Sequence, residues 1–300
     1  MNQALLASLL RPVDKVAHKP RFTLRIDGQV KTGKTNLALT ASADITPIAQ
    51  WSRAKPQTVN DILWLGFEEN CLMFAETRGI RVANALDWSS AKLTYREIRD
   101  AIVALPDAVE EYKKVGVTTI VVDSLSAFDD LLIRDLITMA GHTGDMARIR
   151  AYGQVNEAHM LLFDMLRKTE LNIIGLVHLV EFAPFGEEGG SSQVAQAMAK
   201  QAEKQVHKIE ASAVGGHRSD FVAAMRPKAA SRWARLSDAV ICTYVEQKVI
   251  RAGVTEPQYR FSQSPSDKFA AGGRWDLSGS QEPNLYPILK RLYNIEGKQP

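Results

Sequence analysis

Short apolar runs alternate along the chain with longer segments whose apolar residues recur every three or four positions. The runs are nearly continuous, as expected for strands that are covered on both faces. They occupy Phe22–Ile26, Ile62–Phe67, Thr118–Val122, Asn172–Val177 and Ala239–Tyr244. Strands that alternate with helices favour a parallel sheet wound by β–α–β units. The pattern therefore predicts an α/β fold with a mainly parallel, twisted sheet and helices on both faces.

The segments between these runs carry the helical patterns. A long helix is predicted over Thr94–Lys114, where Pro106 is expected to kink or split it. Further helices are predicted for Lys34 to about Ala43, Leu72–Thr77, Ala127 to about Met139, Gly153–Lys168 and about Leu285–Tyr293. The tail from about residue 245 is expected to mix short strands with that last helix.

Two segments differ from this alternation. Residues 2–11 have a helical leucine stripe that Pro12 ends, and residues 12–20 form a linker. This N-terminal arm, residues 1–20, is expected to dock either on a neighbouring subunit, as an oligomerisation arm, or on the core of its own chain. Residues 183–235 have no strand pattern and contain five glycines. We predict one domain over 21–300, with a mobile insertion at about 183–235 that holds one polar helix.

Composition narrows the class of protein. The 300 residues are 45% hydrophobic and 24% charged, which is ordinary for a globular chain. No apolar run approaches the roughly 18 residues of a membrane span, and no signal-peptide pattern begins the sequence. Two cysteines cannot form a disulfide framework, and no two histidines have zinc-ligand spacing. We therefore expect a protein of the reducing cytoplasm (the host cytoplasm if it is viral), without a membrane partner or structural metal.

The strongest chemical signal is the segment Gly28–Thr35, GQVKTGKT, which matches G-x-x-x-x-G-K-[ST] in full. Its glycines let backbone N–H groups face a polyphosphate. Lys34 is expected to contact the β and γ phosphates of ATP, and the Thr35 hydroxyl is expected to hold Mg²⁺. The residues of the predicted nucleotide loop are Gly28, Gln29, Val30, Lys31, Thr32, Gly33, Lys34 and Thr35.

Polar residues also follow three of the predicted strands. Asp123 ends the run Thr118–Val122 and is the expected second magnesium residue, as in a Walker B motif. Glu68 and Glu69 follow Phe67, and a carboxylate there can activate the attacking water; the sequence leaves open which of the two is the base. His178 follows Val177 and is the candidate γ-phosphate sensor.

These motifs, in this order, resemble the RecA-like core ATPases, and most of all the small phage-encoded group that includes single-strand annealing proteins for recombination. The resemblance spans about residues 20–295. It rests on GQVKTGKT, LWLGFEEN, TTIVVDSLSAF, IIGLVHLVEF, the Ala151-Tyr152-Gly153 helix opening, ARLSDAVICTY, KFAAGGRWDL and EPNLYPILKRL. It implies a RecA-like ATPase domain in which Glu68 takes the role of the catalytic glutamate.

The resemblance also implies where DNA and neighbouring subunits bind. RecA-like proteins bind DNA through loops that correspond here to Gly141–Arg150 and Ala183–Arg235. Although the chain's net charge is only +3, the stretch 200–235 has eight basic and three acidic residues, which suits contact with a phosphate backbone. The candidate DNA contacts are Lys200, Lys204, Lys208, Arg148 and Arg150. Lys268 and Arg274 lie where the resemblance places basic groups that complete a neighbour's site.

Several functions remain compatible with the sequence. The first is an ATPase that acts on single-stranded DNA in phage-type recombination, annealing or replication, as a ring or filament of identical subunits. The alternatives are a hexameric helicase or translocation motor, a P-loop kinase of a small metabolite in which 183–235 is a lid, and a slow nucleotide-binding assembly factor. Stimulation of ATP hydrolysis by single-stranded DNA would separate the first reading from the kinase.

Overall fold

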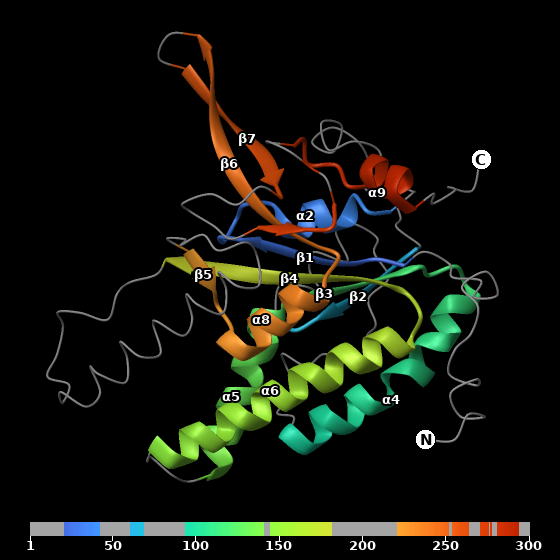
Figure 1. Cartoon of the computed structure of the whole chain (residues 1–300), viewed down its shortest axis with the longest axis vertical. Coiled ribbons are helices and arrows are strands. Elements are labelled where there is room, and N and C mark those ends of the chain that lie inside the picture. Colours follow the sequence, from blue (N-terminus) through green and yellow to red (C-terminus); the bar gives the residue numbers. More distant parts are fainter. Residues whose placement is uncertain are drawn as a thin grey trace, which may run out of the picture.

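A mostly parallel sheet forms the centre of the computed structural model, which describes residues 21–42, 61–68, 94–140, 145–181, 221–251, 254–263, 271–275, 277 and 281–293 (Figure 1). Its described strands are β1 (Thr23–Gly28), β2 (Ile62–Gly66), β3 (Thr119–Asp123), β4 (Asn172–Glu181), β5 (Phe221–Ala223), β6 (Ala239–Arg251), β7 (Val254–Ser262) and β8 (Gly272–Gly273). The order is β2-β3-β4-β1-β6-β7. The strands β2, β3, β4, β1 and β6 run parallel to one another. The strands β5, β7 and β8 each pair antiparallel with a strand of this group.

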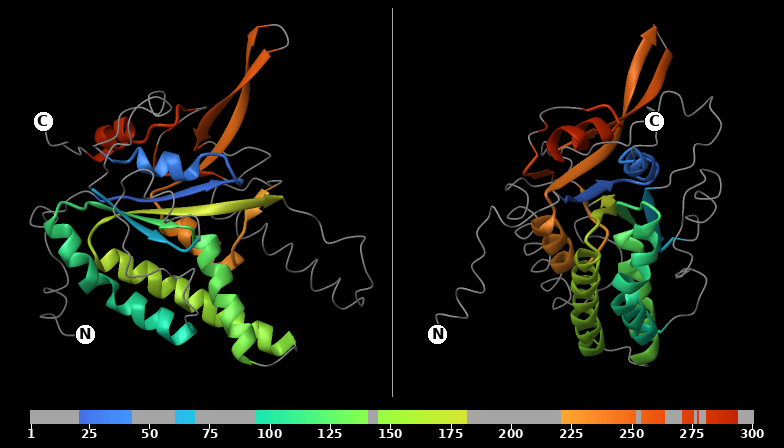
Figure 2. Two further views of the ribbon diagram at one scale, coloured as in Figure 1. Left: turned by 180° about the vertical axis from the view of Figure 1, so that it is seen from behind. Right: turned by 90° about the vertical axis from the view of Figure 1, so that its right-hand side faces the viewer.

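Helices cover both faces of this sheet (Figures 1 and 2). They are α2 (Lys34–Leu39), α4 (Tyr95–Lys114), α5 (Leu125–Ala140), α6 (Asp145–Lys168), α8 (Pro227–Leu236) and α9 (Tyr286–Tyr293). The helices α2 and α9 lie on one face, and α4, α5, α6 and α8 lie on the other. Within β3, Ile120 and Val122 enter one apolar core and Val121 enters the other. Because both faces are buried, the strand sequences are apolar at successive positions, which confirms the predicted fold class.

The strand register brings the polar strand ends to one edge. Gly28 lies opposite His178 on one side and Thr243 on the other, and Gly66 lies opposite Asp123. The chain leaves β1 for the far strand β2, returns through β3 and β4, and then crosses to β6 on the other side of β1. Ligands of open α/β sheets bind at the carboxyl edge where the winding direction reverses in this way. The loop after β1 lies at that point.

Residues 221–235 differ from the predicted mobile insertion. The strand β5 pairs with the end of β4, and α8 buries the indole of Trp233 completely. Arg25, from β1, donates to the carbonyl oxygen of Ala230 at 2.7 Å and ties α8 to the sheet. The three-residue strand is too short to show an alternating pattern, and its burial depends on β4, which is distant in sequence. The preceding part of the predicted insertion lies outside the described residues.

Other elements differ from prediction mainly at their ends. The helix α4 continues through Pro106 without splitting, with Ile98, Ile102 and Leu105 buried beneath it. The helix α6 begins at Asp145 rather than Gly153. The helices predicted over residues 2–11 and Leu72–Thr77 lie outside the described residues.

The strands β6 and β7 form a hairpin that extends beyond the sheet as a two-stranded ribbon (Figures 1 and 2). Only short strands were expected here, because the outer part of the ribbon is exposed and alternates weakly. Across the described parts of the chain, no helix has both the length and the apolar composition needed to cross a membrane.

Candidate nucleotide-binding and catalytic site

The loop between β1 and α2 has the backbone that its glycines predict. Gly33 has φ of 87° and precedes the first residue of α2. A Cβ atom on Gly28 would overlap Thr243 Oγ1 and lie 2.5 Å from Thr32 Oγ1, so only glycine fits at this position. These two threonine hydroxyls share a hydrogen bond of 2.7 Å. The β6 residue Thr243 therefore holds the loop against the sheet. Lys31 is exposed.

Lys34 lies beneath this loop. Its side chain is buried, and Nζ donates to the carbonyl oxygens of Gly28 and Gln29 at 2.8 Å each. Burial lowers the pKa of Lys34, and the negative charges of Asp123 and Glu68 oppose that shift. The ammonium group is therefore preorganised inside the loop by carbonyl groups that phosphate oxygens can replace as partners.

The two predicted magnesium residues lie next to each other. Thr35 Oγ1 donates to Asp123 Oδ2 at 3.4 Å, across 88 positions of sequence. Mg²⁺ prefers oxygen ligands and is usually held by one or two protein groups together with phosphates and water. A hydroxyl and a carboxylate beside a phosphate loop fit that requirement. The described residues contain no group of three or more His, Cys, Asp or Glu side chains that could hold a metal without the nucleotide.

Glu68 and His178 meet at the same edge. Glu68 Oε1 accepts hydrogen bonds of 2.6 Å from His178 Nε2 and from Ser124 Oγ. The backbone N–H of His178 donates to Ser126 Oγ at 2.9 Å. The carboxylate therefore has a fixed orientation between β2, β3 and β4. Glu69, the alternative base, lies outside the described residues.

These contacts set the protonation of Glu68. Burial, the largest single cause, would raise its pKa, but the hydrogen bonds from His178 and Ser124 lower it. Electrostatic interactions with His178 and Lys34 act in the same direction as these hydrogen bonds, and together they outweigh burial. The net shift is downward, so Glu68 is ionised at neutral pH, as an acceptor of a proton from water must be.

A small pocket of about 90 Å³ opens beside the loop, on the side of the hairpin. The Tyr259 ring closes it, since a Cβ atom on Gly33 would lie only 3.1 Å from Tyr259 Cδ1. Pockets for whole ligands are usually about 300–1,000 Å³, so this one is large enough for only part of a ligand. It is lined by Thr32, Gly33, Asn36, Leu37, Thr243, Tyr259, Arg260 and Pro283.

Sequence reasoning missed three residues of this site. Ser124 follows the Walker B aspartate directly and could have been noticed as a donor at a strand end. Thr243 and Tyr259 lie more than 200 positions after the loop. No local pattern marks them, because only the pairing of β6 with β1 and β7 brings them to the site.

Of the other predicted site residues, the structure describes only some, and it places Arg274 away from this edge. Arg148 and Arg150 lie in the first turns of α6 rather than in a loop. Arg274 is 79% exposed, and its Nη1 lies 3.1 Å from Asp238 Oδ1. Asp238 precedes β6 and also accepts from the N–H of Thr23, so Arg274 lies at the amino edge of the sheet, opposite the loop. Lys200, Lys204, Lys208 and Lys268 lie outside the described residues.

The parallel sheet, the loop after β1 and the Thr35–Asp123 pair define a P-loop NTPase. The family model described as AAA domain matches residues 22–275, which is most of the chain. The chain therefore belongs to the AAA domain family, which is a P-loop ATPase-type family. No curated protein matches the sequence.

Proposed function

We propose that this protein is a RecA-like, Mg²⁺-dependent ATPase that acts on single-stranded DNA, in recombination, annealing or replication of the phage type. One observation supports hydrolysis above all. Glu68 is held by His178 and Ser124 at the sheet edge that also holds Lys34 and the pair formed by Thr35 and Asp123. A base, a phosphate-binding cation and a metal-binding pair thus share one edge.

Each residue has a distinct part in this proposal. Lys34 exchanges its two loop carbonyls for phosphate oxygens and neutralises their charge. Thr35 and Asp123 hold Mg²⁺, directly or through water, and the bound ion would supply charge stabilisation at the phosphates. Glu68 orients water and accepts its proton. His178, which lies in β4, holds Glu68 through its hydrogen bond and is the candidate sensor of the γ-phosphate.

Glu68→Gln tests the hydrolysis proposal. Glutamine keeps the size and an oxygen acceptor but cannot take a proton, so ATP turnover should fall by roughly 10² to 10⁴ while ATP affinity changes little. Glu110→Gln, an exposed change on α4, is the matched control and should keep full turnover. Turnover is measured as phosphate release and affinity by calorimetry. If Glu68→Gln hydrolyses ATP at the wild-type rate, Glu68 is not the base.

A basic surface on α8 supports the DNA-binding part of the proposal. Lys228, Arg232 and Arg235 are exposed along α8, at spacings of four and three residues that place them on one side of the helix. The structure records no ion pair for these three residues among the described parts of the chain. They belong to the basic stretch 200–235. A row of unpaired cations of this kind suits a phosphate backbone better than it suits a small neutral metabolite.

Two triple variants with equal charge change test that surface. Replacing Lys228, Arg232 and Arg235 by Ala should weaken binding of single-stranded DNA. It should also reduce the magnitude of the log–log salt slope by about 2, at roughly 0.7 for each lost phosphate contact. The control replaces Arg96, Lys113 and Lys114 on α4 and should leave the slope unchanged. Equal slopes for both variants would move the DNA contacts elsewhere, with Lys200, Lys204 and Lys208 next. If single-stranded DNA does not stimulate ATP hydrolysis, the metabolite kinase becomes the better proposal.

Assembly into a ring or filament is the last part of the proposal. Arg274 is exposed at the edge opposite its own loop, so in this structure it cannot contact a nucleotide bound in cis. If Arg274 contacts a nucleotide, that nucleotide must therefore be bound to a neighbouring subunit. Mixing Arg274→Ala with Lys34→Ala subunits should restore part of the turnover, since each variant supplies what the other lacks. The same mixture with Lys268→Ala subunits tests the second candidate. No recovery in either mixture, with turnover independent of protein concentration, would contradict a shared site.

A further inference from the structure

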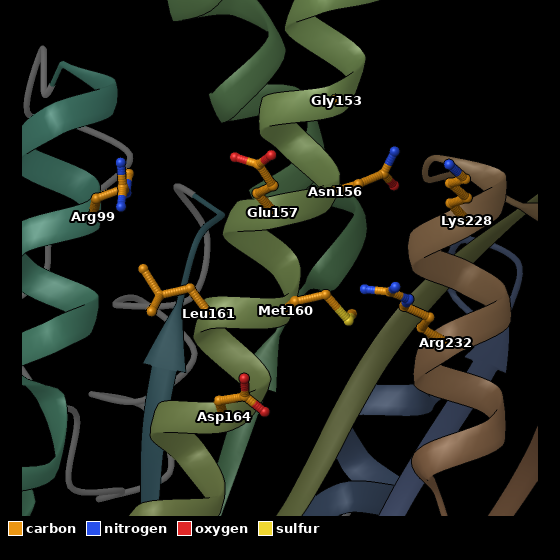
Figure 3. A pocket seen from close by; sticks show the side chains of 9 residues that line it. All are labelled: Arg99, Gly153, Asn156, Glu157, Met160, Leu161, Asp164, Lys228 and Arg232. Carbon is orange, nitrogen blue, oxygen red and sulfur yellow. The ribbon is translucent and has the colours of Figure 1, made fainter.

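A groove of about 510 Å³ runs along α6, far in sequence from the nucleotide loop (Figure 3). The helices α4 and α8 pack against α6 from either side, and between them the outward face of α6 stays open. Figure 3 shows Met160 and Leu161 on this face, with Arg99 from α4 on one side and Arg232 from α8 on the other. A Cβ atom placed on Gly153 would meet nothing within 4 Å, so the groove is also open at that end.

The floor of the groove combines apolar and acidic groups. Met160 and Leu161 are half-buried, while Glu157 and Asp164 are exposed. The described parts of the chain contain no ion pair for either acid. Basic side chains with long apolar stems stand on the walls, and such stems can cover an apolar partner while their charges reach water. The groove therefore fits a short amphipathic helix with leucines on one face and a basic residue near one end.

The chain itself contains such a segment. Residues 2–11 have leucines at positions 5, 6, 9 and 10, and their only charged side chain is Arg11. Ten helical residues are about 15 Å long, and the α6 face from Gly153 to Asp164 is about 18 Å long at the same rise of 1.5 Å per residue. Apolar spacing and length therefore both match the groove.

The position of Arg21, where the described chain begins, also favours residues 2–11 as the occupant of the groove. Arg21 Nη2 lies 3.3 Å from Glu170 Oε2, directly beyond the end of α6. Residues 12–20 can span about 30 Å when extended, at roughly 3.3 Å per residue. The part of α6 from Gly153 to Lys168 is about 24 Å long. A chain that enters from Glu170 reaches the Asp164 end first and would bring Arg11 beside that unpaired carboxylate.

We propose that residues 2–11 dock as a helix in this groove of their own subunit. The leucine stripe covers Met160 and Leu161, and Arg11 pairs with Asp164. This inference does not rest on the proposed ATPase function, and the groove shares Lys228 and Arg232 with the proposed DNA surface. The sequence leaves open whether the N-terminal arm docks on a neighbouring subunit or on its own chain. This proposal chooses docking on its own chain.

Disulfide trapping in the full-length protein tests the proposal. Arg11→Cys with Asp164→Cys replaces the expected ion pair by a potential disulfide, in a Cys71→Ser background. The remaining Cys242 is buried, and burial raises the pKa of its thiol, so it does not compete. The control pairs Arg11→Cys with Glu256→Cys, an exposed acid on the hairpin across the sheet from α6. Mild oxidation should give at least fivefold more intrachain disulfide, counted by peptide mass spectrometry, in the Asp164 pair than in the control.

A second variant gives an independent readout. Gly153→Trp places a large ring in the open end of the groove and should lower the disulfide yield of the Asp164 pair severalfold, without lowering the melting temperature of the domain. Equal yields in the Asp164 pair and the control would overturn the proposal. A disulfide between two chains in the Asp164 pair would also overturn it, because the occupant would then be the arm of a second copy.

Discussion

The ion pair beneath the nucleotide loop offers the sharpest test of how this fold supports its site. Arg25 and Asp27 are 5% and 1% exposed in the centre of β1, directly before Gly28. Arg25 Nε lies 2.7 Å from Asp27 Oδ1, and Nη2 lies 2.5 Å from Oδ2. Replacing Arg25 by Met fills the space but leaves the Asp27 carboxylate buried without its guanidinium partner.

The expected cost follows from that burial. Breaking a buried ion pair on one side costs about 3–5 kcal/mol, because the remaining charge has lost its compensation. For a domain of this size each kcal/mol lowers the melting temperature by about 2–4 °C, so Arg25→Met should melt roughly 6–20 °C below the wild type. Urea unfolding should show a lower midpoint with an unchanged slope. The double variant Arg25→Met, Asp27→Leu should recover most of the loss, since no buried charge remains.

The stability loss caused by Arg25→Met should also depend on pH, in a direction that a loss of packing alone would not produce. Burial raises the pKa of Asp27, and the charges of Arg25 and Lys34 oppose that shift. Without Arg25 the pKa should rise further. A carboxyl group whose pKa is raised in the folded state destabilises the fold when it is ionised. The stability gap between Arg25→Met and the wild type should therefore narrow as the pH falls. A cost under about 1 kcal/mol, a double variant no more stable than the single one, or a gap that widens in acid would refute this reasoning.

Three further predictions concern the site directly. Gly28→Ala should weaken ATP binding at least tenfold in calorimetry, because the new methyl group would overlap Thr243 Oγ1; wild-type affinity would contradict the tight loop packing. Lys34→Ala should lose ATP binding and hydrolysis but melt near the wild-type temperature, since within the described residues the hydrogen bonds of Nζ go to the loop carbonyls of Gly28 and Gln29; a collapse of the melting temperature would show a structural role. His178→Ala should move the acidic limb of the turnover–pH profile to higher pH, because the hydrogen bond and charge that lower the pKa of Glu68 are removed; an unmoved limb would separate the two residues functionally.

The polar residues at the strand ends show which parts of the site local sequence can predict. The loop from Gly28 to Thr35 follows from its own letters, because its conformation needs glycines at stated spacings and its chemistry needs Lys34. Asp123, Glu68 and His178 could be chosen because each follows an apolar run. Parallel strands must end at a common edge, so strand-end polar residues converge without further information.

Contacts between distant segments were decided only by the tertiary structure. Glu68 is oriented by Ser124, Thr243 holds the nucleotide loop, and Tyr259 closes the pocket beside it, yet no spacing in the chain marks these partners. The segment 221–235 seemed irregular because a three-residue strand and a short helix gain their stability from β4 and Arg25 rather than from their own pattern. The sequence by itself determined the apolar periods, the turn-forming glycines and the residue types that carry the chemistry, since these depend on neighbouring positions. Strand order and register decided which of those residues meet, because pairing energy depends on surfaces that the chain brings together only when it folds.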